Sequence, residues 1–180
     1  MHNGSMSDSG EQVVLLADDG SPIGVADKST VHSTQTPLHL AFSCHVFDGE
    51  GRILVTRRAL GKRTWPGVWT NSFCGHPLPG ESVEDGVRRR AQDELGIDLD
   101  NLVLALPDFR YRAVDAAGIV ENEVCPVFTA TIDQELTPAP SEVAEWSWVD
   151  PRELLIAVEA APWAFSPWLT LQLPRLYAER

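Results

Sequence analysis

Residues 70–97, TNSFCGHPLPGESVEDGVRRRAQDELGI, contain a strand end, a turn and a helix in one continuous segment. An apolar run ends in Cys-Gly-His, and the Pro/Gly-rich turn that follows leads to Ser82. Serine is a favourable N-cap because its hydroxyl accepts a hydrogen bond from the first turn of a helix, and Gly96 is a common helix terminator. The sequence therefore predicts a helix between Ser82 and Gly96, directly after a strand end.

The predicted helix places two charges on the same face as its apolar side chains. At about 100° per residue, one face presents Val83, Val87, Arg90, Ala91 and Glu94. The charged pair, four residues apart, can form a salt bridge within the helix. Alternatively, the helix turns both charges toward a bound cation or phosphate. The helical pattern alone leaves both interpretations open.

The composition is that of a single globular domain. The 180 residues are 43% hydrophobic and 22% charged, which are ordinary globular values. No apolar run approaches the roughly 20 residues of a membrane helix, and the N-terminus has no signal-peptide core. The three cysteines, Cys44, Cys74 and Cys125, are odd in number and form no CxxC motif, so neither a disulfide framework nor a cysteine-rich zinc site is expected. We therefore expect a cytoplasmic protein with no membrane partner.

The first ten residues, MHNGSMSDSG, are polar and rich in small side chains. This composition is typical of a disordered terminus. We expect residues 1–10 to form a disordered tail, with Gly4-Ser5-Met6 a cloning remnant and Met6 the native start. Residues 11–180 are expected to form the folded domain.

The charge is unevenly distributed along the chain. The net charge of −12 argues against a nucleic-acid partner. Residues 52–90 are nevertheless cationic, with eight Lys/Arg against three acidic residues. A cationic region in an acidic protein suits a small polyanionic ligand, and the alternative is an ordinary solvated basic face. The cations are Arg52, Arg57, Arg58, Lys62, Arg63, Arg88, Arg89 and Arg90.

The remaining segments predict a mixed sheet with a few helices in one domain. Hydrophobic runs bounded by Gly, Pro and Asp turns indicate strands, and residues 28–37 are expected to form a loop. Asp150-Pro151 is typical of an N-cap followed by Pro at the first helical position, which predicts a helix to about residue 159. An aromatic turn at 162–168 leads to a C-terminal helix. The expected strands are 13–16, 23–26, 40–47, 52–58, 102–113, 119–132 and 145–149.

Two glutamates lie inside an otherwise apolar run, GIVENEVCPVF. In a strand, the alternation of side chains puts Glu121 and Glu123 on one face, with Cα atoms roughly 7 Å apart. Neighbouring carboxylates on a half-buried face repel one another unless something positive satisfies them. A divalent cation explains the pair better than the alternative, an exposed edge strand with solvated acids.

Three histidines and a cysteine add further candidate site residues. Cys74 and His76 leave one side of a strand end at the junction with a helix, and His32 and His39 come from the preceding segment. Taken singly, each is more often a packing residue, and His45, inside a predicted strand, is expected to be structural. Together, His32, His39, His76 and the two glutamates would form a five-ligand nitrogen and oxygen site suited to Mn²⁺, Mg²⁺ or Zn²⁺.

The order of residues along the opening segment resembles the Nudix box, G-x5-E-x7-R-E-U-x-E-E-x-G-U, where U is apolar. The chain departs from it at two acidic positions: Arg90 stands in place of one glutamate, and Asp93 replaces another. Glutamates of that box hold the metal cluster of Nudix hydrolases, so the charge reversal argues against ordinary hydrolysis while keeping the fold. The matching residues are Gly75, Glu81, Arg89, Ala91, Glu94, Gly96 and Ile97.

Three longer segments are similar to type 1 isopentenyl-diphosphate isomerases, a branch of the Nudix superfamily. They are VTRRALGKRTWPGVWTNSFCGHPLPGES, PDFRYRAVDAAGIVENEVCPVF and APWAFSPW, and the similarity extends over about residues 11–177. The resemblance implies an α/β (α+β) Nudix fold, with a mixed sheet sandwiched between helices. It also implies interconversion of isopentenyl and dimethylallyl diphosphate in isoprenoid biosynthesis. The expected protein is a monomer that acts on a small prenyl diphosphate and uses no flavin or nicotinamide.

The resemblance also implies a role for individual residues. Cys74 and Glu123 match the family's two acid/base groups, with Tyr111 beside the glutamate, and Trp168 matches the aromatic wall of the prenyl pocket. Glu94 matches the ligand of a Mg²⁺ that bridges to the substrate diphosphate. The metal ligands are matched by His32, His39, His76, Glu121 and Glu123, and the diphosphate-binding cations by Lys28, Arg58, Lys62 and Arg90.

Moving the double bond requires one carbon to be protonated and another to lose a proton, through a carbocation-like state. The sequence leads to the hypothesis that Glu123, assisted by Tyr111, delivers the proton and Cys74 removes one, or the reverse, since the reaction is reversible. The main alternative is a Nudix-type hydrolase of a small diphosphate. A non-catalytic binding module is the third interpretation, and the Cys74/Glu123 pair argues against it.

Overall fold

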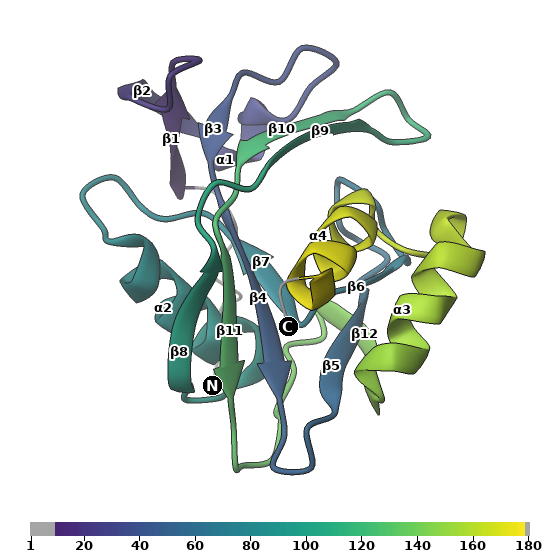
Figure 1. Ribbon diagram of the computed structural model, residues 1–180. Coiled ribbons are helices and arrows are strands. Elements are labelled where there is room, and N and C mark those ends of the chain that lie inside the picture. The colour runs from purple at the N-terminus through teal and green to yellow at the C-terminus, as the bar shows by residue number, and fades with distance from the viewer. Residues whose placement is uncertain (1–9, 179–180) are drawn as a thin grey trace, which may run out of the picture.

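The computed structural model describes residues 10–178. Apart from Gly10, the predicted disordered tail at residues 1–10 lies outside the described residues, as do the last two residues of the predicted domain. The described chain contains two β-sheets and four α-helices (Figure 1). This arrangement confirms the predicted mixed sheet with a few helices in a single domain.

The strands fall into two groups that correspond to the two sheets. The smaller sheet contains β1 (Gln12–Leu16), β2 (Pro22–Asp27), β3 (His39–Leu40), β9 (Arg110–Val114) and β10 (Val120–Val124). The larger contains β4 (Phe42–Phe47), β5 (Ile53–Arg58), β8 (Asp100–Leu106), β11 (Val127–Thr131) and β12 (Val143–Val149), with the short strands β6 (Trp69–Thr70) and β7 (Phe73–Gly75) paired to β5 and β4. The helices are α1 (Lys28–Val31), α2 (Val83–Leu95), α3 (Pro151–Ala160) and α4 (Pro167–Ala178), with a 3₁₀ turn, η1, at Pro162–Ala164.

The order of strands is β2-β1-β3-β10-β9 in the smaller sheet and β12-β5-β4-β11-β8 in the larger. Two pairs are parallel, β3 with β10 and β4 with β11, and the remaining pairs are antiparallel. Both sheets therefore share the same central segments of chain. Figure 1 shows the smaller sheet above the larger, with these segments running from one to the other.

The prediction of three long strands was wrong, because each is broken in two. Residues 40–47, 102–113 and 119–132 form the pairs β3/β4, β8/β9 and β10/β11, and each pair divides between the sheets. The breaks at Ala41 and Pro126 lie side by side: the N–H of Ala41 donates to the Val124 carbonyl at 2.9 Å, and that of Ser43 to the Pro126 carbonyl at 3.1 Å. Proline has no N–H and cannot continue a strand ladder, so the hydrogen bonding changes partner here.

The larger sheet is covered on both faces. Along β4, the side chains of Phe42, Cys44 and Val46 pack on one face with α2, as the alternation of a strand requires. On the other face, Ile53 and Val55 of β5 pack with the buried residues of α3 and α4. The sheet is thus sandwiched between α2 on one side and α3 with α4 on the other (Figure 1), which confirms the predicted layers.

The helix ends agree with the capping signals of the sequence. The Ser82 hydroxyl accepts a hydrogen bond from the Asp85 N–H at 3.1 Å, and Gly96 ends α2 in the left-handed conformation, with φ 65°. Asp150 caps α3 through the N–H groups of Arg152 and Glu153. The predicted loop at 28–37 instead begins with the one-turn helix α1, which the sequence did not indicate.

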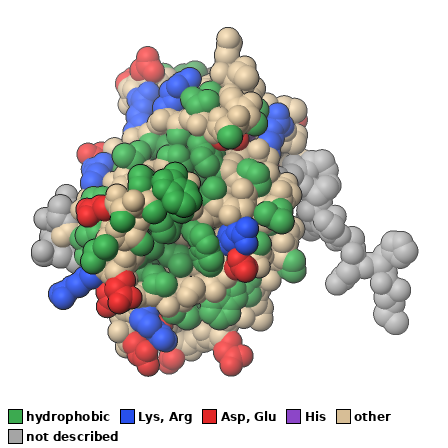
Figure 2. All heavy atoms as spheres, turned by 90° about the vertical axis from the view of Figure 1, so that its right-hand side faces the viewer, with side chains coloured by type: hydrophobic (Ala, Val, Ile, Leu, Met, Phe, Trp, Pro, Cys, Tyr) green, Lys and Arg blue, Asp and Glu red, His purple; other side chains and the backbone are tan. Residues whose placement is uncertain are grey.

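Exposed hydrophobic side chains gather on the face that includes α3, as Figure 2 shows. Ile156 of α3, Trp163 of η1 and Leu171 of α4 are all exposed.

Among residues 10–178, none of the helices has both the length and the apolar character needed to cross a membrane.

Replacing Gly96 by alanine should lower the free energy of unfolding by about 2 kcal/mol or more. The left-handed backbone costs an L-residue roughly 1–2 kcal/mol, and the added Cβ would overlap the Thr137 hydroxyl. Gly49→Ala is the matched control, because nothing lies within 4 Å of its Cβ position and its φ is not left-handed. Urea denaturation measures the free energy of unfolding of both variants. An equal decrease in the two would contradict this account.

Candidate active site

A pocket of about 260 Å³ lies where the two sheets meet α2 and α4. It brings together all the predicted site residues except His39, which is fully buried and contacts Glu123. The pocket is lined by residues from distant parts of the sequence, so the fold and not local sequence assembles it. The predicted residues in its lining are Lys28, His32, Arg58, Lys62, Cys74, His76, Arg90, Glu94, Tyr111, Glu121, Glu123 and Trp168.

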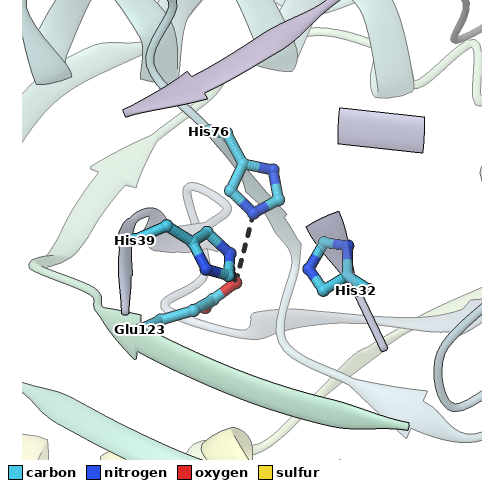
Figure 3. Close-up of side chains that lie close together, drawn as sticks. All are labelled: His32, His39, His76 and Glu123. Carbon is cyan, nitrogen blue, oxygen red and sulfur yellow. Dashed lines mark hydrogen bonds and ion pairs between the residues drawn. The ribbon is translucent and has the colours of Figure 1, made fainter. Parts of the chain in front are cut away.

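Three histidines surround the Glu123 carboxylate at one end of the pocket (Figure 3). His32 follows α1, His39 lies on β3, His76 follows β7 and Glu123 lies on β10, directly opposite His39 in the β3–β10 pair. One ligand atom of each residue lies within 4.8 Å of the others. The imidazole ring centroids are 5.1–5.7 Å apart.

Glu121 lies beside this group of four. One carboxylate oxygen is 3.0 Å from His32 Nε2, and the other accepts a hydrogen bond from the Thr64 hydroxyl at 2.8 Å. Both glutamates are about 6% exposed, so the predicted pair is buried and faces the histidines. The alternative of an exposed edge strand with solvated acids is therefore wrong.

The hydrogen bonding of this cluster suits a metal ion. His39 Nδ1 donates to the Pro37 carbonyl at 3.0 Å, which leaves the lone pair of Nε2 directed into the cluster. Within residues 10–178, the buried Nε2 atoms of His32 and His39 and one oxygen of Glu121 have no hydrogen-bond partner. Buried polar atoms without partners are costly, and a divalent cation would satisfy all three at once.

Burial and the shared carboxylate set the ionisation of the cluster. Burial lowers the pKa of His39, but the Glu123 carboxylate, 3.4 Å from Nε2, outweighs it and leaves that pKa raised. At His76 burial dominates, and its pKa falls to about 4. Burial alone would raise the pKa of Glu123, yet the two histidines hold it well below its usual value. An ionised Glu123 and a neutral His76 are the forms that bind metals.

Cations gather at the other end of the pocket. Arg90 and Glu94 of α2 are both 7% exposed, and Arg90 Nη2 donates to a Glu94 oxygen at 2.5 Å. Burial lowers the pKa of Lys62 to about 8, Glu94 opposes that change, and the nearby charges of Arg58, Arg90 and Lys28 add to it. The predicted salt bridge is therefore present, and the same pair lines the pocket, so the two interpretations do not exclude one another.

Cys74 and Tyr111 are held by hydrogen bonds on the wall between these two ends. The Tyr111 hydroxyl donates to Glu123 at 2.9 Å, and the Cys74 thiol donates to Asn71 Oδ1 at 3.2 Å. The indole N–H of Trp168 donates to the same Asn71 oxygen at 2.9 Å. The Arg58 guanidinium lies 5.3 Å from the centre of the Trp168 ring. A thiol, a carboxylate and two aromatic rings thus face a single cavity.

Several site residues were missed by sequence reasoning. Asn71, fully buried, fixes both Cys74 and Trp168, and its place three residues before Cys74 could have suggested this role. Glu142 contacts Lys62 and lies 3.5 Å from Arg90 Nη2, but the loop before β12 carries no local signal of that position. Thr64, which binds Glu121, lies in a loop whose path only the fold determines.

The sequence matches a known family and its curated members over most of its length. Residues 37–169 match the NUDIX domain. The isopentenyl-diphosphate Delta-isomerase of Leifsonia xyli is 74% identical over 170 residues, which cover 93% of this chain and 92% of that protein. Enzymes of the same name from Clavibacter michiganensis and Citrobacter koseri are 66% and 53% identical, and cover 94% and 91% of this chain and 87% and 90% of their own lengths.

Solved structures show the same fold at low sequence identity. A Deinococcus radiodurans protein has a TM-score of 0.73 at 18% identity, and covers 93% of this chain and 99% of its own. A MutT protein from Methanosarcina mazei has a TM-score of 0.63 at 22% identity, and covers 79% of this chain and 95% of its own.

Purified protein should hold one divalent metal ion per chain in the His/Glu cluster. His76→Gln should weaken that binding by more than the roughly 10–100-fold that loss of an outer-shell partner costs. His45→Gln is the matched control, because it makes the same substitution at a buried histidine outside the cluster. Elemental analysis and competition with a chelator measure both. Equal metal loss in the two variants would count against this site.

Proposed function

The chain belongs to the isopentenyl-diphosphate Delta-isomerases of the Nudix family, and we propose that it interconverts isopentenyl and dimethylallyl diphosphate with Cys74 and Glu123 as its acid/base pair. The observation that best supports this chemistry is the pocket itself. It contains a thiol, a buried carboxylate and an aromatic wall next to a group of cations. These are the groups needed to hold a short prenyl diphosphate and to move a proton at each end of its double bond.

The cationic end binds the diphosphate in this proposal. Lys28, Arg58, Lys62 and Arg90 line that end, and the low pKa of Lys62 reflects burial with other positive charges around it. A diphosphate would relieve this repulsion and would receive charge-assisted hydrogen bonds. Anchoring the diphosphate fixes how far the prenyl chain reaches toward Cys74 and Glu123, which lowers the entropy cost of the proton transfers.

The Trp168 indole forms the wall of the prenyl end. Its ring is 2% exposed, lies 5.5 Å from the Trp65 ring and 5.8 Å from the Tyr111 ring, and is fixed by Asn71. An aromatic face stabilises a developing carbocation by about 2 kcal/mol in a desolvated site, and does not react with it. The Arg58 guanidinium at 5.3 Å already uses a similar attraction to the same ring.

The ionisation of the resting pocket supports one assignment of the two roles. Burial raises the pKa of Cys74 to about 12, whereas Glu123 has a pKa well below its usual value. The resting pair is therefore a thiol and a carboxylate. From that state Cys74 protonates the terminal carbon of isopentenyl diphosphate, and Glu123 removes a proton from the allylic carbon. The sequence left the direction of these two roles open, and the return reaction exchanges them.

Two divalent ions fit the donor groups of the pocket. His32, His39, His76, Glu121 and Glu123 would hold one, Mn²⁺, Mg²⁺ or Zn²⁺, and Glu94 would hold a Mg²⁺ bound to the diphosphate. The first would fix the Glu123 carboxylate, and the second would neutralise phosphate charge. Tyr111 donates to Glu123 at 2.9 Å, so it orients the carboxylate in either proton-transfer direction.

A Nudix-type hydrolase of a small diphosphate remains the second candidate, because the fold is shared. The exchange of a glutamate for Arg90 in the Nudix box argues against it. In the structure Arg90 neutralises Glu94, where a hydrolase would place further carboxylates around its metals.

An NMR experiment in D₂O distinguishes the two reactions. The protein is incubated with isopentenyl diphosphate and Mg²⁺, and the isomerase should place deuterium in the carbon chain and form dimethylallyl diphosphate without free phosphate. Release of phosphate or diphosphate from unlabelled substrate would instead establish the hydrolase.

Cys74→Ala should reduce turnover by 10²–10⁴-fold or more, the usual contribution of a positioned acid/base group, while fold and metal content stay unchanged. Glu123→Gln should lose turnover and also bind metal more weakly, because Glu123 belongs to the metal cluster. Cys44→Ala is the matched control, since that cysteine is fully buried on the α2 face of the sheet. Near-wild-type kcat in Cys74→Ala would disprove the assigned role.

A further inference from the structure

A line of buried polar side chains extends from Cys74 into the core. Ser43 and His45 lie on β4 and alternate with the residues that face α2, so they face the opposite side, where α4 lies. Gln172 of α4 bonds to both. Ser43, His45 and Gln172 are all 0% exposed. Polar groups in such a layer are costly to bury unless they are hydrogen-bonded, and apolar side chains would fill the space at lower cost.

The hydrogen bonds of this line run in one direction. His45 Nε2 lies 3.0 Å from Gln172 Oε1, which can only accept, so the ring carries its hydrogen on Nε2. The other ring nitrogen, Nδ1, has no hydrogen-bond partner among residues 10–178 and keeps its lone pair. The Gln172 amide nitrogen then donates to the Ser43 hydroxyl oxygen at 2.9 Å. His45 therefore fixes the orientation of the Gln172 amide, and Gln172 fixes that of Ser43.

The Ser43 hydroxyl lies between two sulfur atoms, those of Cys74 and Cys125, each 3.4 Å away. Because its oxygen accepts from Gln172, its own hydrogen is available to a sulfur. The Cys74 thiol hydrogen is directed to Asn71 Oδ1, which leaves the Cys74 sulfur lone pairs for Ser43. Cys125 can donate to the second lone pair of the Ser43 oxygen. In this assignment the hydroxyl hydrogen of Ser43 and the thiol hydrogens of Cys74 and Cys125 each have an acceptor.

We propose that Ser43 is a positioning residue that donates a hydrogen bond to the Cys74 sulfur, and that Gln172 and His45 orient it. This inference rests on the proposed function. When Cys74 protonates the substrate, its S–H bond breaks, a C–H bond forms and the electron pair stays on sulfur. Asn71 can then offer the sulfur no hydrogen, because its amide hydrogens go to the carbonyls of Cys44 and Phe73. Ser43 supplies a hydrogen bond that strengthens as charge develops.

Ser43→Ala tests this role against Ser72→Ala. Ser72 is a matched control because it is 1% exposed, lies between β6 and β7, and its hydroxyl bonds to the backbone of Val46 and Leu54. Ser43→Ala should lower kcat for isopentenyl diphosphate at least tenfold and leave KM within twofold. Ser72→Ala should lower Tm without that loss of kcat. Equal kcat in the two variants would overturn the proposal.

Gln172→Met tests whether the line acts as a unit. It removes the donor to Ser43 at nearly constant volume, so kcat should fall by less than in Ser43→Ala, again with little change in KM. The double variant should be no slower than Ser43→Ala alone, because the second substitution acts only through Ser43. If the kcat losses of the two single variants multiply in the double variant, Gln172 does not act through Ser43, and this part of the proposal is wrong. If Ser43→Ala does not fold, a wild-type kcat in Gln172→Met would equally disprove the positioning role of Ser43.

The wild-type protein separates this inference from the proposed function. If wild type forms dimethylallyl diphosphate and Ser43→Ala matches it, only the role of Ser43 fails. If wild type does not isomerise the substrate at all, the proposed function itself fails.

Discussion

The need to satisfy one buried carboxylate, Glu123, organises the active site. This residue is 6% exposed, and its carboxylate accepts a hydrogen bond from Tyr111 at 2.9 Å and lies 3.2 Å and 3.4 Å from nitrogens of His76 and His39. Burying an unpaired carboxylate would cost several kcal/mol. Each partner comes from a different element: the strands β3 and β9 flank β10, and His76 follows β7. The site therefore requires both sheets to be assembled in register.

That register depends on the breaks in the long strands. At Ala41 and Pro126 two neighbouring strands leave one sheet and enter the other at the same level, so residues a few positions apart serve different layers. His39 and Glu123, above the breaks, belong to the His/Glu cluster that could hold a metal ion. Ser43, below them, lies between Cys74 and the α4 layer. If either strand continued through its break within one sheet, the residues above and below the break would belong to the same layer. The His/Glu cluster and Ser43 could then not serve different layers.

The sequence was sufficient for the fold class and for most of the residues that line the pocket, but not for the links between them. Capping residues such as Ser82 and Gly96 act locally, so α2 could be placed almost to the residue. The breaks were missed because apolar runs such as 40–47 have the same composition whether they stay in one sheet or cross between two. Asn71, Gln172 and Glu142 were missed because their partners are distant in sequence: Gln172 and Ser43, for example, are separated by 129 residues.

The pair of Arg90 and Glu94 explains how one substitution can change the chemistry that a shared fold supports. Three or four carboxylates on this helix face would concentrate negative charge, which demands several metal ions before a diphosphate can approach. With Arg90 at 2.5 Å from Glu94, the same face is close to neutral, and both side chains stay buried. In the proposed mechanism such a face binds a diphosphate with a single bridging ion and without a cluster of metals to activate water. The proposal then gives the diphosphate the role of anchoring the prenyl chain, and it assigns the proton transfers to the thiol and carboxylate of the same pocket.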